Sequence, residues 1–356
     1  MQNEWLNRIA LTWANKTRQR QVRTLLEQYG SATDVIAHRC DLVTKEAVDH
    51  AQKELEFIDK HNIGLYFYKD DNYPYRLASC VDAPILLYSK GNVNLNAKHM
   101  VSVVGTRMPS ERGKDWCRRL VLDLAEQVPD LTIVSGLAYG IDIVAHKAAI
   151  EAGIPTIIVP AHGLDRIYPA VHRNVAVQAL DKGGIVTEYT FGTEPERFNF
   201  VARNRIVAGL ADAVVIVESK RKGGSLITAD MAVDYGRDVF AVPGRIDDEC
   251  SAGCNQLIKC NKAHMIETAE DLVKNMQWGY STSQPKQTTM VELLYNLSEP
   301  QQKLYELLRE AEEGLHINQL VMEAQIGYNI VSAELVMMEL QDVVKSMPGG
   351  MWRVKK

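Results

Sequence analysis

The chain has 356 residues, of which 46% are hydrophobic and 24% charged, a composition typical of a water-soluble protein with two or three domains. It contains no apolar run near the roughly 18 residues of a membrane span, and its N-terminus lacks the apolar core of a signal peptide. Six scattered cysteines and a net charge of −5 predict a cytoplasmic protein with reduced thiols and without a basic surface overall.

The first 62 residues are predicted to form a small all-helical module. Apolar residues recur at helical spacing over 5–10 and 22–26. A turn follows at 29–31, and a longer helix is expected from 44 to about 60.

Residues 63–277 alternate between short β-rich runs and helical segments. Each run is nearly continuously apolar, as a strand covered on both faces requires. The alternation predicts an α/β fold with an extended Rossmann-like, doubly wound parallel sheet. The expected strands are 101–104, 132–134, 156–159, 185–187, 213–217 and 239–241.

The remainder of the chain is predicted to form a linker and a winged helix. Residues 278–289 lose apolar periodicity and are rich in Ser, Thr and Gln, as linkers are. Within 290–356, three helices and a β-hairpin follow one another in the order of a winged helix. These elements are expected at 299–312, 317–325, 330–342, 343–347 and 351–354.

The third of these helices argues against binding of duplex DNA by the winged helix. It contains Glu334, Glu339 and Asp342 and no Lys or Arg, and DNA phosphates repel such a helix. We therefore expect this domain to contact protein, either a second copy of the chain or another partner.

Glycines and polar residues follow nearly every predicted strand of the parallel sheet. Ligands bind beyond the carboxyl ends of such strands. Glycine-rich turns that open helices, as at 136–140 and 223–225, let backbone N–H groups approach an anion. Arg107, Arg203 and Arg205 can add charge-assisted bonds, or they can instead be solvated or paired with carboxylates.

Three common motifs are absent from the sequence, and their absence limits which phosphate-containing ligand the chain is expected to bind. No dinucleotide-binding G-x-G-x-x-G follows the first strand, and neither a P-loop nor a G-x-S-x-G nucleophile elbow is present. Several predicted phosphate-binding turns and arginines lie beside the aromatic residues Tyr168, Phe191 and Phe200. Such a set suits an extended polymer better than a single nucleotide, and single-stranded nucleic acid is the natural candidate.

Seven motifs together resemble the DNA-processing protein A (DprA/Smf) family. The resemblance is dense over roughly 100–260, and the flanking helical and winged-helix segments agree with the family's usual arrangement. The motifs are VVGTR at 103–107, SGLAYGID at 135–142, GLDRIYP at 163–169, NFVARNRIVAG at 199–209, GSLITA at 224–229, GRDVFAVPG at 236–244 and GCNQLI at 253–258.

This resemblance implies a domain plan and a function. The plan is a SAM/helix-hairpin-helix-like module at 1–62, a single-stranded-DNA-binding domain at 63–277, the linker, and the winged helix. The implied protein is a cytoplasmic homodimer that protects single-stranded DNA and helps load RecA recombinase onto it in natural transformation. It has no catalytic residue, metal or cofactor.

The family's binding pocket maps onto nine residues of this chain. Arg203 and Arg205 are two residues apart in a predicted helix and cannot share a face, so one of them can hold the core or a carboxylate instead, and we assign Arg203 to the DNA. The mapped residues are Arg107, Gly136, Asn199, Phe200, Arg203, Arg205, Lys220, Gly224 and Ser225.

Two other readings compete with this assignment. Nucleoside monophosphate phosphoribohydrolases have a similar glycine-rich turn, but Met231 stands where their glutamate would be needed as general acid or base. Cys250, Cys254, Cys260 and His264 could form a zinc site, although their spacing is not a common zinc pattern. His146 and His162 lack an accompanying nucleophile, and His146 is expected to pack within its helix.

Overall fold

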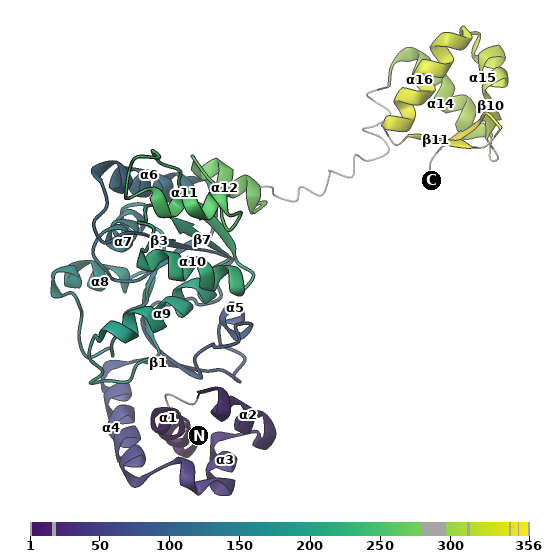
Figure 1. Cartoon of the computed structure of the whole chain (residues 1–356). Coiled ribbons are helices and arrows are strands. Elements are labelled where there is room, and N and C mark those ends of the chain that lie inside the picture. Colours follow the sequence, from purple (N-terminus) through teal and green to yellow (C-terminus); the bar gives the residue numbers. More distant parts are fainter. Residues whose placement is uncertain are drawn as a thin grey trace. The chain divides into compact units, whose positions relative to one another are not determined.

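The computed structural model describes residues 2–15, 19–278, 297–311, 314–341, 343–347 and 349–354. Met1–Gly279 forms one compact unit and Tyr280–Lys356 a second (Figure 1). The predicted linker lies outside the described residues except for its first residue. No helix among the described residues is long and apolar enough to cross a bilayer.

The described residues of the N-terminal module form four α-helices and a short 3-10 helix. Their apolar faces form two clusters that also include residues of the first two strands, so the module packs directly on one edge of the sheet. Thr44 caps the longest helix by accepting from the Ala47 N–H, which explains where that helix begins. The elements are α1 Gln2–Ala14, α2 Gln19–Tyr29, α3 Ala32–His38, η1 Cys40–Leu42 and α4 Lys45–His61.

The central sheet has nine strands in the order β1-β2-β6-β5-β4-β3-β7-β8-β9. The strands from β6 to β9 pair in parallel, which confirms the predicted α/β class, whereas β1 and β2 are antiparallel additions at one edge. The strands are β1 Gly64–Phe67, β2 Leu86–Gly91, β3 His99–Val104, β4 Leu131–Ser135, β5 Thr156–Ile158, β6 Gly184–Thr187, β7 Ala213–Ile216, β8 Asp238–Ala241 and β9 His264–Met265.

Helices cover both faces of this sheet. One face packs on α6, α7 and α12, and the other on α5, α9, α10 and α11, so every central strand is buried on both sides. The shorter α8 packs over β5 and β6. The helices are α5 Tyr75–Ala78, α6 Glu111–Gln127, α7 Ile141–Glu151, η2 Ala170–His172, α8 Arg173–Ala179, α9 Arg197–Leu210, α10 Gly224–Asp234, α11 Ala252–Lys259 and α12 Ala269–Asn275.

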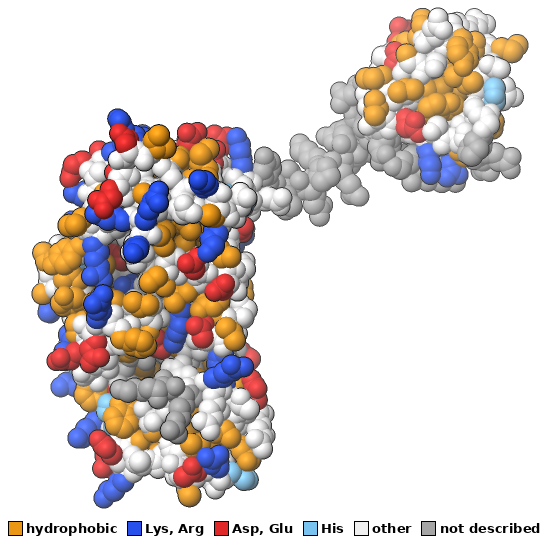
Figure 2. Space-filling model, viewed as in Figure 1, with side chains coloured by type: hydrophobic (Ala, Val, Ile, Leu, Met, Phe, Trp, Pro, Cys, Tyr) orange, Lys and Arg blue, Asp and Glu red, His pale blue; other side chains and the backbone are white. Residues whose placement is uncertain are grey.

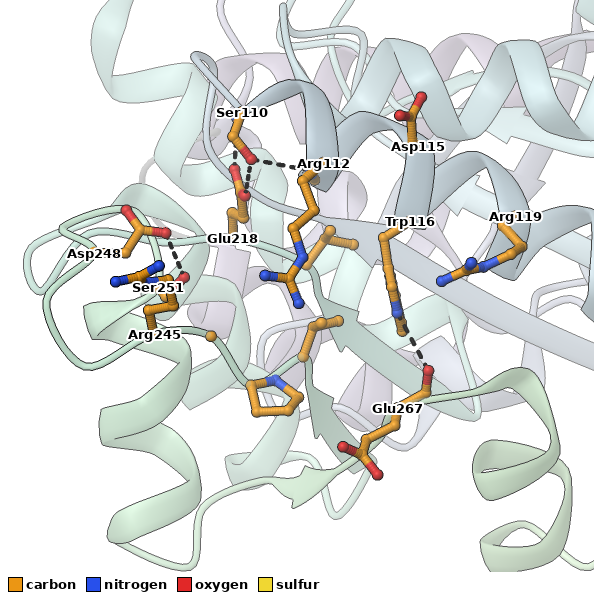
Figure 3. A pocket seen from close by; sticks show the side chains of 15 residues that line it. Ser110, Arg112, Asp115, Trp116, Arg119, Glu218, Arg245, Asp248, Ser251 and Glu267 are labelled. Carbon is orange, nitrogen blue, oxygen red and sulfur yellow. Dashed lines mark hydrogen bonds between the residues drawn. The ribbon is translucent and has the colours of Figure 1, made fainter.

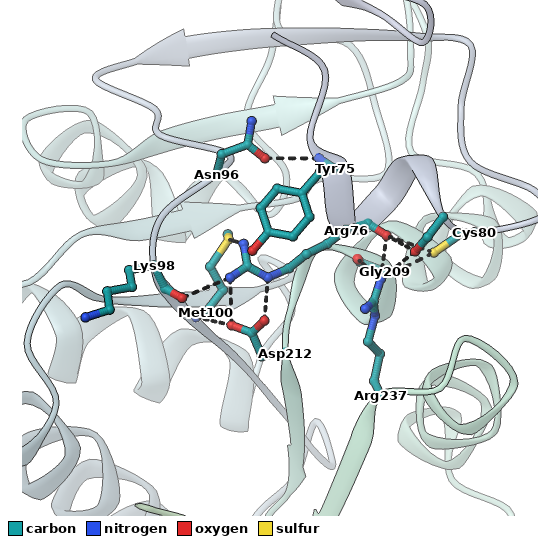
Figure 4. A network of polar contacts seen from close by, with 10 residues as sticks. Tyr75, Arg76, Cys80, Asn96, Lys98, Met100, Gly209, Asp212 and Arg237 are labelled. Atoms are coloured by element: carbon teal, nitrogen blue, oxygen red, sulfur yellow. Dashed lines mark hydrogen bonds and ion pairs between the residues drawn. The ribbon is translucent and has the colours of Figure 1, made fainter. Parts of the chain in front are cut away.

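A buried ion pair anchors α5 to the sheet. Arg76 Nε and Nη2 bind the two carboxylate oxygens of Asp212 at 2.5 and 2.9 Å, and Asp212 also accepts from the Met100 N–H (Figure 4). Arg237 reaches the same region and donates to the Gly209 carbonyl. The network joins segments that are far apart in sequence at the amino ends of β3 and β7.

The C-terminal unit is a winged helix. Three helices among its described residues surround a small apolar core, and its sheet has the strand order β10-β12-β11. Hydrophobic side chains also gather on its surface (Figure 2), among them those of Ile330, Met337 and Leu340 on α16. The elements are α14 Glu299–Glu310, β10 Leu315–His316, α15 Ile317–Ala324, α16 Tyr328–Leu340, β11 Val344–Met347 and β12 Met351–Val354.

Candidate phosphate-binding cleft

The strand order places a switch point between β3 and β7. The chain leaves β3 for α6 on one face of the sheet and leaves β7 for α10 on the other, so the two following loops diverge. Such a divergence at the carboxyl ends of parallel strands opens a crevice for ligand. A cleft of about 300 Å³ lies at this point, between the loops that follow β3 and β7 and the side of α9.

Six of the nine residues assigned from the sequence line this cleft. Asn204, Lys222 and Thr106 line it as well, although the motif comparison did not single them out as binding residues. Lys222 does belong to the basic stretch that precedes α10, and that stretch is the signal that could have identified it. The six assigned residues are Arg107, Phe200, Arg203, Lys220, Gly224 and Ser225.

The Arg203 side chain is buried in the wall of the cleft without a bound partner. Its relative exposure is only 4%, and no hydrogen bond or ion pair joins its guanidinium to any described residue. Burial lowers the pKa of Arg203, and the buried Asp142 carboxyl opposes that change. The Asp142 carboxyl offsets part of the cost of burying this charge, but it forms no hydrogen bond with the guanidinium, whose N–H groups remain available to a further anion.

The amino end of α10 forms another part of the cleft. Its N-cap, Gly223, provides no side-chain hydrogen bond to the first turn, so N–H groups there remain available to an anion. A Cβ on Gly224 would meet no other atom within 4 Å, which shows that this backbone is open to a ligand. The Ser225 hydroxyl donates to Ser219 Oγ at 2.8 Å and is thereby held at the cleft.

An aromatic ring lies beside the cationic groups. The Arg107 guanidinium lies 5.2 Å from the centre of the Phe200 ring, and the centre of the Tyr168 ring lies 6.0 Å from that of Phe200. Phe200 and Arg107 therefore offer a planar surface for a base next to a positive charge. Phe191 is placed differently, because it stacks on His50 and Phe57 of the N-terminal module.

Gly136 and Arg205 do not line the cleft. A Cβ on Gly136 would collide with the Arg203 guanidinium, so this glycine provides space for Arg203 and does not itself face a ligand. Arg205 is directed to the other side of α9, where its Nη2 lies 2.6 Å from Glu188 Oε2 in a buried ion pair.

Asn199 also lies outside the cleft. Its side-chain amide donates to the Glu194 carbonyl at 3.1 Å, and the Tyr189 hydroxyl donates to its backbone carbonyl. Asn199 therefore stabilises the first turn of α9, about one turn before Arg203 in the cleft wall.

The residues that were considered for catalysis or for zinc binding lie within the protein core or apart from one another. His146 is fully buried between Thr156 and the Gly136 carbonyl, and burial lowers its pKa to about 4. Met231 packs against the core under α10. Cys254 is buried and Cys260 is exposed, and the described residues contain no group of three or more side chains placed to hold a metal.

Comparison with known proteins identifies the family. Residues 64–277 match the family model of DNA recombination-mediator protein A, and 290–350 match the DprA winged helix domain. DNA processing protein DprA of Streptococcus pneumoniae is 39% identical over 229 residues, which span 64% of this chain and 78% of that protein. Protein Smf of Escherichia coli is 32% identical over 308 residues, 86% of this chain and 81% of that protein.

Solved structures agree with this comparison. The X-ray structure of the Streptococcus pneumoniae protein matches with a TM-score of 0.65 and 34% identity over 74% of this chain and 95% of that chain. DNA processing protein A from Helicobacter pylori, whose structure describes a single-stranded DNA binding mode, matches with a TM-score of 0.54 and 30% identity over 60% and 95% of the two chains. The chain therefore belongs to the DNA recombination-mediator protein A family, also called DprA or Smf.

Proposed function

We propose that this protein binds single-stranded DNA in the cleft between the β3 and β7 loops. The observation that carries the proposal is the buried guanidinium of Arg203, which faces the cleft without an anionic partner within hydrogen-bond distance. A DNA phosphate would supply that partner. The open start of α10 and Arg107 would hold neighbouring phosphates, and Phe200 would stack on a base.

The binding mode follows from the kinds of group that line the cleft. Guanidinium and backbone N–H groups recognise phosphate, which every nucleotide carries, and an aromatic face accepts any base. Binding is therefore independent of sequence and falls steeply with salt concentration. Such binding requires no bond cleavage. Membership of the DprA family supports the further proposal that the protein acts as a homodimer, protects the strand and presents it to RecA recombinase in natural transformation.

The cleft assignment is tested by titrating labelled oligo-dT and a duplex of equal length with four proteins. Arg107→Ala and Arg203→Met should each lower affinity for oligo-dT by about 10- to 100-fold, because each loses a charge-assisted bond to phosphate. Arg39→Ala, which removes an exposed arginine of the N-terminal module, serves as the matched control and should bind like wild type. Preference of the wild type for duplex, or full binding by both cleft variants, would refute the assignment.

The proposed roles of RecA and of the dimer need separate measurements. Sedimentation equilibrium should give twice the chain mass of 39.9 kDa. Addition of the protein should shorten the delay before RecA polymerises on single strands covered by a single-stranded-DNA-binding protein. Arg203→Met should lose that effect, whereas an unchanged delay with the wild type would argue against RecA loading.

A further inference from the structure

A second hollow, which we call the α6 groove, adjoins the cleft. It has a volume of about 840 Å³ and lies between α6 and the loop that follows β8. Both hollows are lined by the loops that follow β3 and β7. In the β3 loop Arg107 lines the cleft and Ser110 the groove, and in the β7 loop Ser219 lines the cleft and Glu218 the groove. A polymer that leaves the cleft over the β3 loop would therefore enter the α6 groove.

Two unpaired arginines are directed into this groove. Arg112 and Arg119 are exposed, and neither forms an ion pair or hydrogen bond through its side chain with a described residue. They are seven residues apart on one face of α6, and Figure 3 shows both guanidinium groups on the groove side of the helix. Arg118 on the same helix differs, because it pairs with Glu151.

An indole ring lies between these two arginines. Trp116 is half-buried, packs partly on the core beneath α6, and donates its indole N–H to the Glu267 carbonyl at 3.3 Å (Figure 3). Those contacts hold the ring in one orientation at the wall of the groove. A fixed aromatic surface flanked by cations is the arrangement that binds the bases and phosphates of single-stranded nucleic acid.

No carboxylate that lines the groove forms an ion pair with Arg112 or Arg119. Both oxygens of Glu218 accept hydrogen bonds from Ser110, one from its N–H at 2.9 Å and one from its hydroxyl at 2.5 Å. Asp248 accepts from the Ser251 hydroxyl, and Asp115 also lines the groove without an ion pair to either arginine (Figure 3). Arg245 already has a partner in Asp247, and Glu267 also lines the groove.

We propose that the DNA strand bound in the cleft continues over the β3 loop into the α6 groove, where Arg112 and Arg119 bind its phosphates and Trp116 stacks on a base. This inference rests on the proposed single-stranded DNA binding and extends the binding site to a second segment of the strand. Seven helical residues separate the two arginines by about 10 Å along α6, so they would hold different phosphates.

The test compares oligo-dT of increasing length, from about 4 to about 20 nucleotides. A strand that fills only the cleft should bind wild type and the double variant Arg112→Ala/Arg119→Ala equally. A longer strand should bind the double variant at least about tenfold more weakly, and its salt slope should fall by about 1.4, which corresponds to two phosphate contacts at about 0.7 each. Arg118→Ala is the matched control on the same helix and should change neither quantity.

The outcomes separate this inference from the proposed function. If the double variant binds long strands with wild-type affinity and salt slope, the α6 groove does not hold DNA, while binding in the cleft stands. An equal loss for short and long strands would also overturn the inference, because it would show no separate second segment. If wild type binds no oligo-dT of any length, the proposed function itself fails.

Discussion

Arg203 and Arg205 are close in sequence and lie in opposite environments. Both belong to α9, and both are largely buried, with exposures of 4% for the Arg203 residue and 13% for the Arg205 side chain. Arg205 is bonded to Glu188 at the end of β6, whereas Arg203 faces the cleft without such a partner. The same residue type therefore stabilises the fold at one position and is available to a ligand at the other.

Stability measurements should distinguish these two arginines. Arg205→Ala should lower the free energy of unfolding by about 3 kcal/mol or more, because it leaves the buried Glu188 carboxylate unpaired. Arg203→Met should lower the free energy of unfolding by less than Arg205→Ala does, since it breaks no hydrogen-bonded ion pair and removes only the longer-range attraction to the Asp142 carboxyl. Urea denaturation followed by circular dichroism measures both. A wild-type midpoint for Arg205→Ala would contradict the structural role of its ion pair.

At the scale of elements, α4 is attached to the sheet through a buried carboxyl group and an aromatic stack. Glu54 of α4 is 1% exposed, and its carboxyl accepts from the Phe191 N–H in the loop after β6. The Phe191 ring stacks on Phe57 and on His50, which in turn stacks on Trp13. Removal of water from around the carboxyl raises the pKa of Glu54 to about 8.

This carboxyl predicts a pH dependence with a definite sign. Because the pKa of Glu54 rises from 4.5 to about 8 on folding, the folded protein holds a proton that the unfolded chain releases between these values. The stabilising contribution is complete below pH 4.5 and decreases by at most about 1.4 kcal/mol per pH unit as pH rises toward 8.

Glu54→Gln provides the measurement. The glutamine retains a carbonyl that can accept from Phe191, and it does not titrate. The difference in free energy of unfolding between wild type and Glu54→Gln should therefore change across pH 5–8 in favour of the variant as pH rises. A difference that stays constant across that range would show that Glu54 titrates normally in the folded protein.

At the scale of the whole molecule, the winged helix differs in surface chemistry from the α/β unit. Its helix α16 carries no Lys or Arg and exposes large apolar side chains, including Leu340 at 77%. Such a helix would be repelled by DNA phosphates and is suited to contact with protein. The proposed cleft lies entirely within the first compact unit.

Deletion of residues 290–356 should therefore leave the affinity for oligo-dT within about threefold of wild type, since no proposed phosphate contact is removed. Gel-shift titration of the truncated protein measures the affinity, and sedimentation measures its oligomeric state. A large loss of affinity with unchanged oligomeric state would show that the winged helix binds the DNA directly.

The comparison of sequence with structure shows which features were predictable. Continuous apolar runs identified the central parallel strands, because strands covered on both faces must be apolar throughout. The antiparallel β1 and β2 were not among the expected strands, and the two-residue β9 is too short to show a pattern. Phe191 could not be separated from Phe200 by sequence, because the partners that enclose it come from α4.

The sequence alone determined the family, the α/β fold with its helical and winged-helix additions, and the loops that carry the cleft. These follow from local periodicity and from motifs that each lie within a short segment. Only the tertiary structure decided which charged groups are available to a ligand. Availability depends on partners from distant segments. Glu188 forms an ion pair with Arg205, whereas no carboxylate among the described residues forms a hydrogen-bonded ion pair with Arg203, Arg112 or Arg119. Whether a side chain is buried or ion-paired depends on the residues that surround it in the folded protein, and the spacing of residues within one helix cannot predict this.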